Sequence, residues 1–220
     1  MIRSAIFDID GTLLDSMKVW DDLGARYLRS RGVEPEENLA ETLFPMTLEE
    51  GCSYMKEHYR LPEGEETIKK GIGDIFARFY NEEAELKPGA AEYVRKLHGM
   101  GIPMVLATVG DAQLERNALR RLGILGCFKK LFNCGDYGTS KREPLIHLKA
   151  AEFLGTKPSE TAVFEDTYAA VHSAHTAGFF VAAVEDAASS ADRDKIRKEA
   201  DIYIRDFEKA PDPEEIFLKN

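Results

Sequence analysis

The sequence predicts an α/β protein with a doubly wound, mostly parallel, Rossmann-like sheet and an inserted all-helical cap. Short β-branched and apolar runs alternate with helix-period segments of roughly 10 to 15 residues along most of the chain. A helical block without a convincing strand interrupts this alternation after the first run. The chain has 220 residues, which is long enough for one core that carries a smaller inserted domain.

The first predicted strand covers residues 2–9, whose sequence IRSAIFDI ends at the turn signal DG. Residues 15–85 then have helical periodicity, are rich in Glu, Lys and Arg, and are interrupted by glycines and prolines. We expect this segment to form the cap, joined to the core by two short hinges. The α/β catalytic core is therefore predicted to comprise residues 1–14 and 86–220.

The rest of the core is expected to alternate between strands and helices. Further strands are predicted at residues 102–108, 130–135, 161–166, 179–184 and 201–204. The helices between them are predicted at residues 90–100, 111–123, 143–155 and 167–178, followed by a polar helical segment that ends at Glu199. Helical crossovers between parallel strands cover both faces of a sheet, so this order favours a doubly wound sheet.

Composition and charge exclude several classes of partner. The chain has 29 basic and 39 acidic residues and a net charge of -10, which repels nucleic acid and anionic membranes. No apolar run reaches the length of a membrane span, and the amino terminus does not resemble a signal peptide. We expect a cytoplasmic protein, a monomer or weak dimer, with the unpaired cysteines Cys52, Cys127 and Cys134 as reduced thiols.

Polar side chains gather at the carboxyl ends of the predicted strands. Ligands of open parallel sheets bind beyond these ends, where helix amino termini and loop amides converge. The candidate site residues are Asp8, Asp10, Thr108, Glu165 and Asp166 at strand ends, with Lys141 at the start of the helix that follows residues 130–135. Acids, a hydroxyl and an ammonium group are thus expected in one crevice.

Four carboxylates in one crevice repel one another unless a cation or a proton compensates their charge. A cluster of hard oxygen donors favours Mg²⁺, which commonly shares its coordination shell with a phosphate. Lys141 and Thr108, together with loop amides, are then expected to hold the remaining phosphate oxygens. This mixture suits phosphoryl transfer, in which catalysis consists mainly of positioning and charge neutralisation.

Four segments resemble, in order, the motifs of the haloacid dehalogenase superfamily. They are FDIDGT at residues 7–12, AT at 107–108, Lys141 within SKREPLIHLKAAE, and VFED at 163–166. Four ordered motifs at matching strand ends are far more specific than the first motif alone. The chain is most similar to the helical-cap branch of the superfamily, which includes sugar-phosphate phosphatases and β-phosphoglucomutase.

The resemblance implies a role for each candidate residue. Asp8 is expected to attack phosphorus and form an aspartyl-phosphate, and Asp10 to protonate the leaving alkoxide and then activate water. The implied metal ligands are Asp8, the main-chain carbonyl of Asp10, Asp166 and Glu165, the last either on the metal or beside its ligands. The implied phosphate-binding residues are Gly11, Thr108, Val109 and Lys141, with the amides of Gly110 and Asp111 replacing the side-chain donor that Val109 lacks.

The sequence therefore predicts a Mg²⁺-dependent phosphatase for a small phosphorylated metabolite such as a sugar phosphate. Asp10 disfavours dehalogenation and phosphonate cleavage, because relatives with those activities lack this second carboxylate. A phosphosugar mutase is an alternative, although β-phosphoglucomutase-like proteins have a histidine where this chain has Trp20. A non-catalytic phosphate-metabolite binding protein that kept the site is a third possibility.

Overall fold

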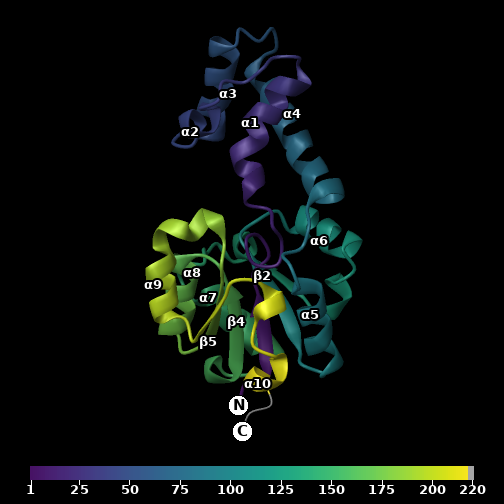
Figure 1. Ribbon diagram of the computed structural model, residues 1–220, viewed down its shortest axis with the longest axis vertical. Helices are drawn as coiled ribbons and strands as arrows, with labels where there is room; N and C mark the ends of the chain where they lie inside the picture. The colour runs from purple at the N-terminus through teal and green to yellow at the C-terminus, as the bar shows by residue number, and fades with distance from the viewer. Residues whose placement is uncertain (218–220) are drawn as a thin grey trace. The chain divides into compact units, whose positions relative to one another are not determined.

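The computed structural model describes residues 1–217, except for the side chain of Asp21, and the chain forms two compact units (Figure 1). The α/β unit consists of Met1–Ser16 and the chain from Ala84 onward, and the helical unit consists of Met17–Glu83. Within the described residues, no helix combines the length and hydrophobicity that a bilayer crossing requires.

The α/β unit contains an all-parallel sheet with the strand order β3-β2-β1-β4-β5-β6. The strands are β1 (Ser4–Phe7), β2 (Met104–Thr108), β3 (Leu131–Asn133), β4 (Thr161–Glu165), β5 (Phe180–Val184) and β6 (Ile202–Ile204). The order reverses at β1, which lies between β2 and β4. The predicted doubly wound α/β fold is confirmed, and the reversal marks the place where such sheets bind ligands.

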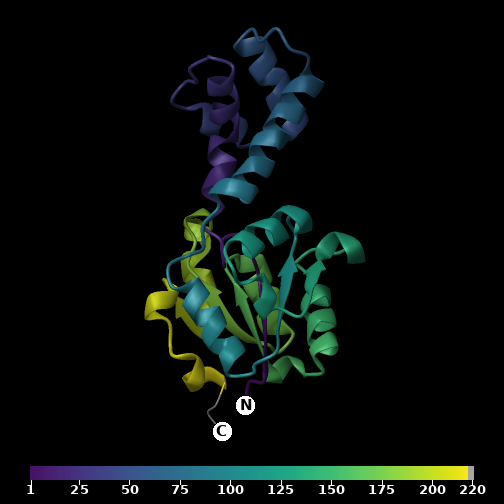
Figure 2. The same cartoon turned by 90° about the vertical axis from the view of Figure 1, so that its right-hand side faces the viewer.

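Helices cover both faces of this sheet (Figures 1 and 2). The α/β unit contains α5 (Ala90–Gly99), α6 (Ala112–Arg121), α7 (Leu145–Leu154), α8 (Tyr168–Thr176), α9 (Arg193–Glu199) and α10 (Pro213–Phe217). On one face, Val163 of β4 packs in a cluster with residues of α7, α8 and α9. On the other face, Phe164 stacks on Phe7 at 4.1 Å and contacts Tyr93 of α5 and Phe207. Adjacent residues of a strand thus fill opposite cores.

The helical unit contains α1 (Lys18–Ser30), α2 (Leu39–Leu43), α3 (Leu48–His58) and α4 (Glu65–Arg78), followed by the π-helical segment Phe79–Glu83. Thr47 starts α3, because its hydroxyl accepts the amide of Glu50 and the Glu50 carboxylate accepts the amide of Thr47. Trp20 packs on Phe76 at 4.7 Å between ring centroids and stays 55% exposed. The assignment of residues 15–85 as a cap stays a prediction.

Two local predictions were wrong. The strand predicted at residues 130–135 ends at Asn133, because the Asn133 side chain accepts the amide of Gly135 and starts a short 3-10 helix. Lys141 lies in a turn rather than at a helix start, and α7 begins at Leu145 after Pro144. The predicted polar helical segment that ends at Glu199 is confirmed, and it consists of a 3-10 helix, Ala187–Asp192, followed by α9.

Candidate active site

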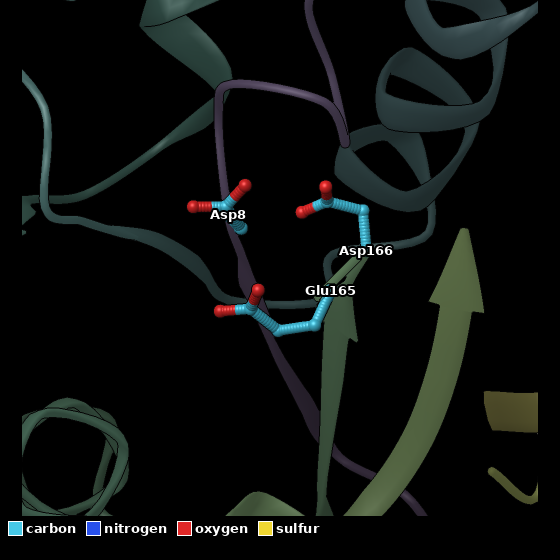
Figure 3. Close-up of side chains that lie close together, drawn as sticks. All are labelled: Asp8, Glu165 and Asp166. Atoms are coloured by element: carbon cyan, nitrogen blue, oxygen red, sulfur yellow. The ribbon is translucent and has the colours of Figure 1, made fainter. Parts of the chain in front are cut away.

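Three carboxylates converge at the carboxyl ends of β1 and β4 (Figure 3). Asp8 follows β1, Glu165 is the last residue of β4, and Asp166 comes next. All three are buried, and each offers an oxygen within 4.8 Å of the others. Because β1 and β4 are adjacent parallel strands, their carboxyl ends meet at the same edge of the sheet.

Lys141 supplies the positive charge beside these carboxylates. Its Nζ donates to Asp8 Oδ1 and, at 2.5 Å, to Glu165 Oε1. Burial alone would lower the pKa of Lys141, but the Asp8 and Glu165 carboxylates outweigh burial and raise it. For Glu165, burial would raise the pKa, but Lys141 and His147 outweigh it and hold the pKa below its usual value. Lys141 and Glu165 are therefore a charged pair.

The site holds more negative charge than Lys141 compensates. Burial raises the pKa of Asp8 to about 7, opposed by Lys141 and reinforced by Glu165. Burial, then Asp8 and Glu165, raise the pKa of Asp166 well above its usual value. Asp166 Oδ1 accepts from Thr12 at 3.3 Å, whereas its buried Oδ2 has no hydrogen-bond partner among the described residues. Buried carboxyl groups whose ionisation is opposed in this way are oxygen donors that a hard divalent cation would stabilise in the ionised form.

Asp10 and Gly11 form the turn that follows Asp8. Gly11 has a φ of 81°, which a glycine adopts without steric cost, and its amide donates to Leu14 O at 3.0 Å. The amide of Gly11, a residue predicted to bind phosphate, is therefore already paired within the turn. Asp10 Oδ1 accepts from Ser16 Oγ at 2.6 Å, so the Asp10 side chain is anchored by a residue that the sequence analysis did not single out.

Thr108 ends β2 and is paired with Glu115 of α6, a residue that the sequence analysis missed. The Thr108 hydroxyl donates to Glu115 Oε1 at 2.5 Å and accepts the amide of Gly110 at 2.9 Å. Glu115 is fully buried, and burial together with Asp10 raises its pKa to about 9. Val109 is 64% exposed, and because its side chain has no hydrogen-bond donor, only its main chain could serve a phosphate.

His147 is another polar residue that the sequence analysis missed. It is fully buried in α7, and its Nε2 lies 3.4 Å from Glu165 Oε1. Burial lowers its pKa, which favours the neutral ring. Glu115 and His147 both occupy the apolar face of their helices, since His147 precedes Ala150 and Ala151 at helical spacing and Glu115 precedes Ala118 and Leu119. A polar residue on an apolar helix face was the available signal.

Comparison with known proteins agrees with this geometry. The chain matches the haloacid dehalogenase-like hydrolase family over residues 2–178 and belongs to that family. It is 27% identical over 177 residues to a phosphorylated carbohydrates phosphatase of Thermotoga maritima, covering 80% of this chain and 82% of the relative. It is 28% identical over 215 residues to hexitol phosphatase A of Escherichia coli, covering 94% and 92%.

Among solved structures, the chain is similar to a putative β-phosphoglucomutase from Thermotoga maritima. The TM-score is 0.81 at 24% identity, covering 99% of this chain and 97% of the other, which is a likeness of fold. The predicted family is confirmed by these comparisons. The predicted enzyme class is confirmed with it: the chain is a phosphoric monoester hydrolase.

Proposed function

We propose that this enzyme is a Mg²⁺-dependent phosphatase that hydrolyses a small phosphorylated metabolite through an aspartyl-phosphate on Asp8. The observation that carries the proposal is the convergence of Asp8, Glu165 and Asp166 with Lys141 at the point where the strand order reverses. A nucleophilic carboxylate, donors for a cation and a fixed ammonium group are the parts that phosphoryl transfer requires.

The donor set fits Mg²⁺. Asp8, Asp166 and the main-chain carbonyl of Asp10 would hold the ion, and the unpartnered Oδ2 of Asp166 is a free donor for it within the described residues. Glu165 stays a predicted ligand whose Oε1 is already shared with Lys141. When bound, the metal supplies positive charge that stabilises the charge developing on the phosphoryl oxygens.

The protein groups then divide the chemistry into two steps. In the first, an Asp8 oxygen forms a bond to phosphorus while the bond from phosphorus to the ester oxygen breaks and Asp10 gives its proton to the leaving alkoxide. In the second, water attacks phosphorus, Asp10 takes a proton from that water, and the Asp8 carboxylate is released with inorganic phosphate. Lys141 holds Asp8 in place and neutralises part of the charge in both steps.

A sugar phosphate is the substrate class that the relatives favour. The names of two relatives are phosphorylated carbohydrates phosphatase and hexitol phosphatase A. A phosphorylated sugar or hexitol carries its phosphate as an ester of a polyhydroxylated carbon chain. Alkoxides are poor leaving groups, so a substrate of this kind depends on proton donation by Asp10.

The test compares wild type with Asp8→Asn on a panel of sugar phosphates and on p-nitrophenyl phosphate. We expect Asp8→Asn to lose turnover by at least about 10⁴-fold, whereas Asp136→Asn, the same change at an exposed aspartate, keeps it. EDTA should abolish activity and added Mg²⁺ restore it. Acid-quenched wild type should carry a phosphoryl group on Asp8 by mass spectrometry, and full activity of Asp8→Asn would refute the proposal.

The same panel separates the alternatives. A phosphosugar mutase would move phosphate between positions of a hexose phosphate without releasing inorganic phosphate. A non-catalytic binding protein would bind phosphate and Mg²⁺, measured by calorimetry, and turn over no member of the panel.

A further inference from the structure

His147 is a buried histidine whose ring faces Glu165. It lies in the first turn of α7 and is fully buried. Its Nε2 lies 3.4 Å from Glu165 Oε1, which is a long hydrogen bond. The same oxygen accepts from Lys141 Nζ at 2.5 Å, and Lys141 also donates to Asp8. A chain of contacts therefore runs from His147 through Glu165 and Lys141 to the proposed nucleophile.

The direction of this hydrogen bond follows from its partners. Glu165 forms a charged pair with Lys141, so its Oε1 can only accept. Of the two ring nitrogens of His147, Nδ1 is buried and has no hydrogen-bond partner among the described residues. The proton is therefore assigned to Nε2, the nitrogen that faces the carboxylate. A neutral ring and a charged ring both donate from this nitrogen, so the bond does not depend on the titration of His147.

Packing alone would favour phenylalanine at this position. The His147 ring lies edge-on to the ring of Phe179, with 6.0 Å between the centroids, and α7 also buries Ile146 and Ala150. A buried nitrogen without a partner destabilises the folded protein in such surroundings, whereas phenylalanine has a ring without nitrogen. What the histidine supplies and phenylalanine lacks is a hydrogen-bond donor for Glu165.

We propose that His147 is a positioning residue that holds Glu165, and through it Lys141, in place beside Asp8. The ammonium group of Lys141 ends a flexible side chain, and its position depends on the two carboxylates to which it donates. If Glu165 turns away, one of these two contacts is lost, and small displacements of a catalytic group lower rates strongly. This inference rests on the proposed function, in which Lys141 neutralises charge on the phosphoryl group.

Stability and catalysis should respond in opposite orders to two substitutions of His147. Phenylalanine keeps an aromatic ring and loses the donor. Glutamine keeps a donor on its side-chain amide but places a second polar atom in an apolar site. We therefore expect His147→Phe to be the more stable variant and His147→Gln to be the more active one. For a residue that only packs, the more stable variant would also be the more active.

The experiment compares wild type, both variants and the control His98→Phe, the same change at an exposed histidine in the last turn of α5. It measures kcat/KM for p-nitrophenyl phosphate, the dissociation constant of inorganic phosphate by calorimetry, both with Mg²⁺, and the melting temperature. In His147→Phe we expect kcat/KM to fall at least about tenfold and phosphate to bind at least about threefold more weakly. His147→Gln should stay within about threefold of wild type in kcat/KM, and His98→Phe should match wild type.

Wild-type kcat/KM in folded His147→Phe, or a His147→Gln variant as impaired as His147→Phe, overturns the inference. A more stable variant that is also the more active one overturns it as well. If His147→Phe does not fold, His147→Met replaces it, because methionine fills apolar sites and has no donor. The proposed function stands or falls separately: it fails if wild type cleaves no phosphate ester or if Asp8→Asn keeps full activity.

Discussion

Replacing Glu115 by glutamine should make the stability of the protein less dependent on pH. Burial, together with the neighbouring Asp10, raises the pKa of Glu115 to about 9 in the folded protein. In the unfolded chain the carboxyl group ionises near its ordinary pKa of about 4.3. The folded state thus keeps a proton that the unfolded state releases, and the free energy of unfolding falls as pH rises between these two values.

The change in the free energy of unfolding follows from the width of the pH range between the two pKa values. A group that is protonated only in the folded state contributes about 1.4 kcal/mol per pH unit, so between about pH 5.5 and 8.5 the upper limit is about 4 kcal/mol. Glutamine has no such proton, and Glu115→Gln should lose this part of the pH dependence. Asp8 and Asp166, whose pKa values are also raised, are present in both proteins and cancel in the comparison.

The assay is urea unfolding followed by far-ultraviolet circular dichroism at both pH values, in EDTA so that no metal binds the carboxylates. The stability of Glu115→Gln relative to wild type should increase by about 2–4 kcal/mol from the lower to the higher pH. Glu92→Gln, the same change at an exposed position, should follow wild type. Curves for Glu115→Gln and wild type that stay parallel within about 0.5 kcal/mol would show that Glu115 titrates normally, which would refute the reasoning.

Two further substitutions, one in each unit, test what stabilises the fold. Lys87 donates to Asp186 at 2.9 Å, and the two side chains are 9% and 4% exposed. Lys87→Met leaves Asp186 buried without its partner and should lower the free energy of unfolding by about 3–5 kcal/mol. The control Lys209→Met, which removes a surface pair with Asp206, should lower it by less than about 1 kcal/mol. Equal losses in urea unfolding would contradict this. Gly73 is exposed within α4, and a methyl group added there would have nothing within 4 Å. Because alanine favours the helix over glycine, Gly73→Ala should raise the free energy of unfolding by about 0.5–1 kcal/mol. A lower melting temperature of this variant would contradict the prediction.

The alternation of strands and helices was sufficient to predict the fold, because each parallel strand needs a crossover that returns the chain to the same edge. The same rule predicts that Asp8, Thr108 and Asp166 lie at one edge of the sheet, and the structure puts all three at strand ends. Their chemical roles stay predictions. The ends of the elements were harder to predict, because they depend on single side-chain contacts. The side chain of Asn133, for example, accepts the amide of Gly135 and ends β3 early.

Glu115 and His147 were not singled out from the sequence, although each lies on the apolar face of its helix. A glutamate or a histidine in a helix usually faces solvent. Only the packing of α6 and α7 against the sheet buries them and brings them to Thr108, Asp10 and Glu165.

The sequence by itself determined the order of the elements and the reactive groups at the strand ends, because hydrophobic periodicity and chain topology are local and regular. The tertiary structure decided which groups hydrogen-bond and which pKa values are shifted, because both depend on burial and on distances of a few ångströms between segments far apart in the chain. The difference between Glu115, which is buried and accepts from Thr108, and Glu92, which is an exposed helix residue, is of this kind.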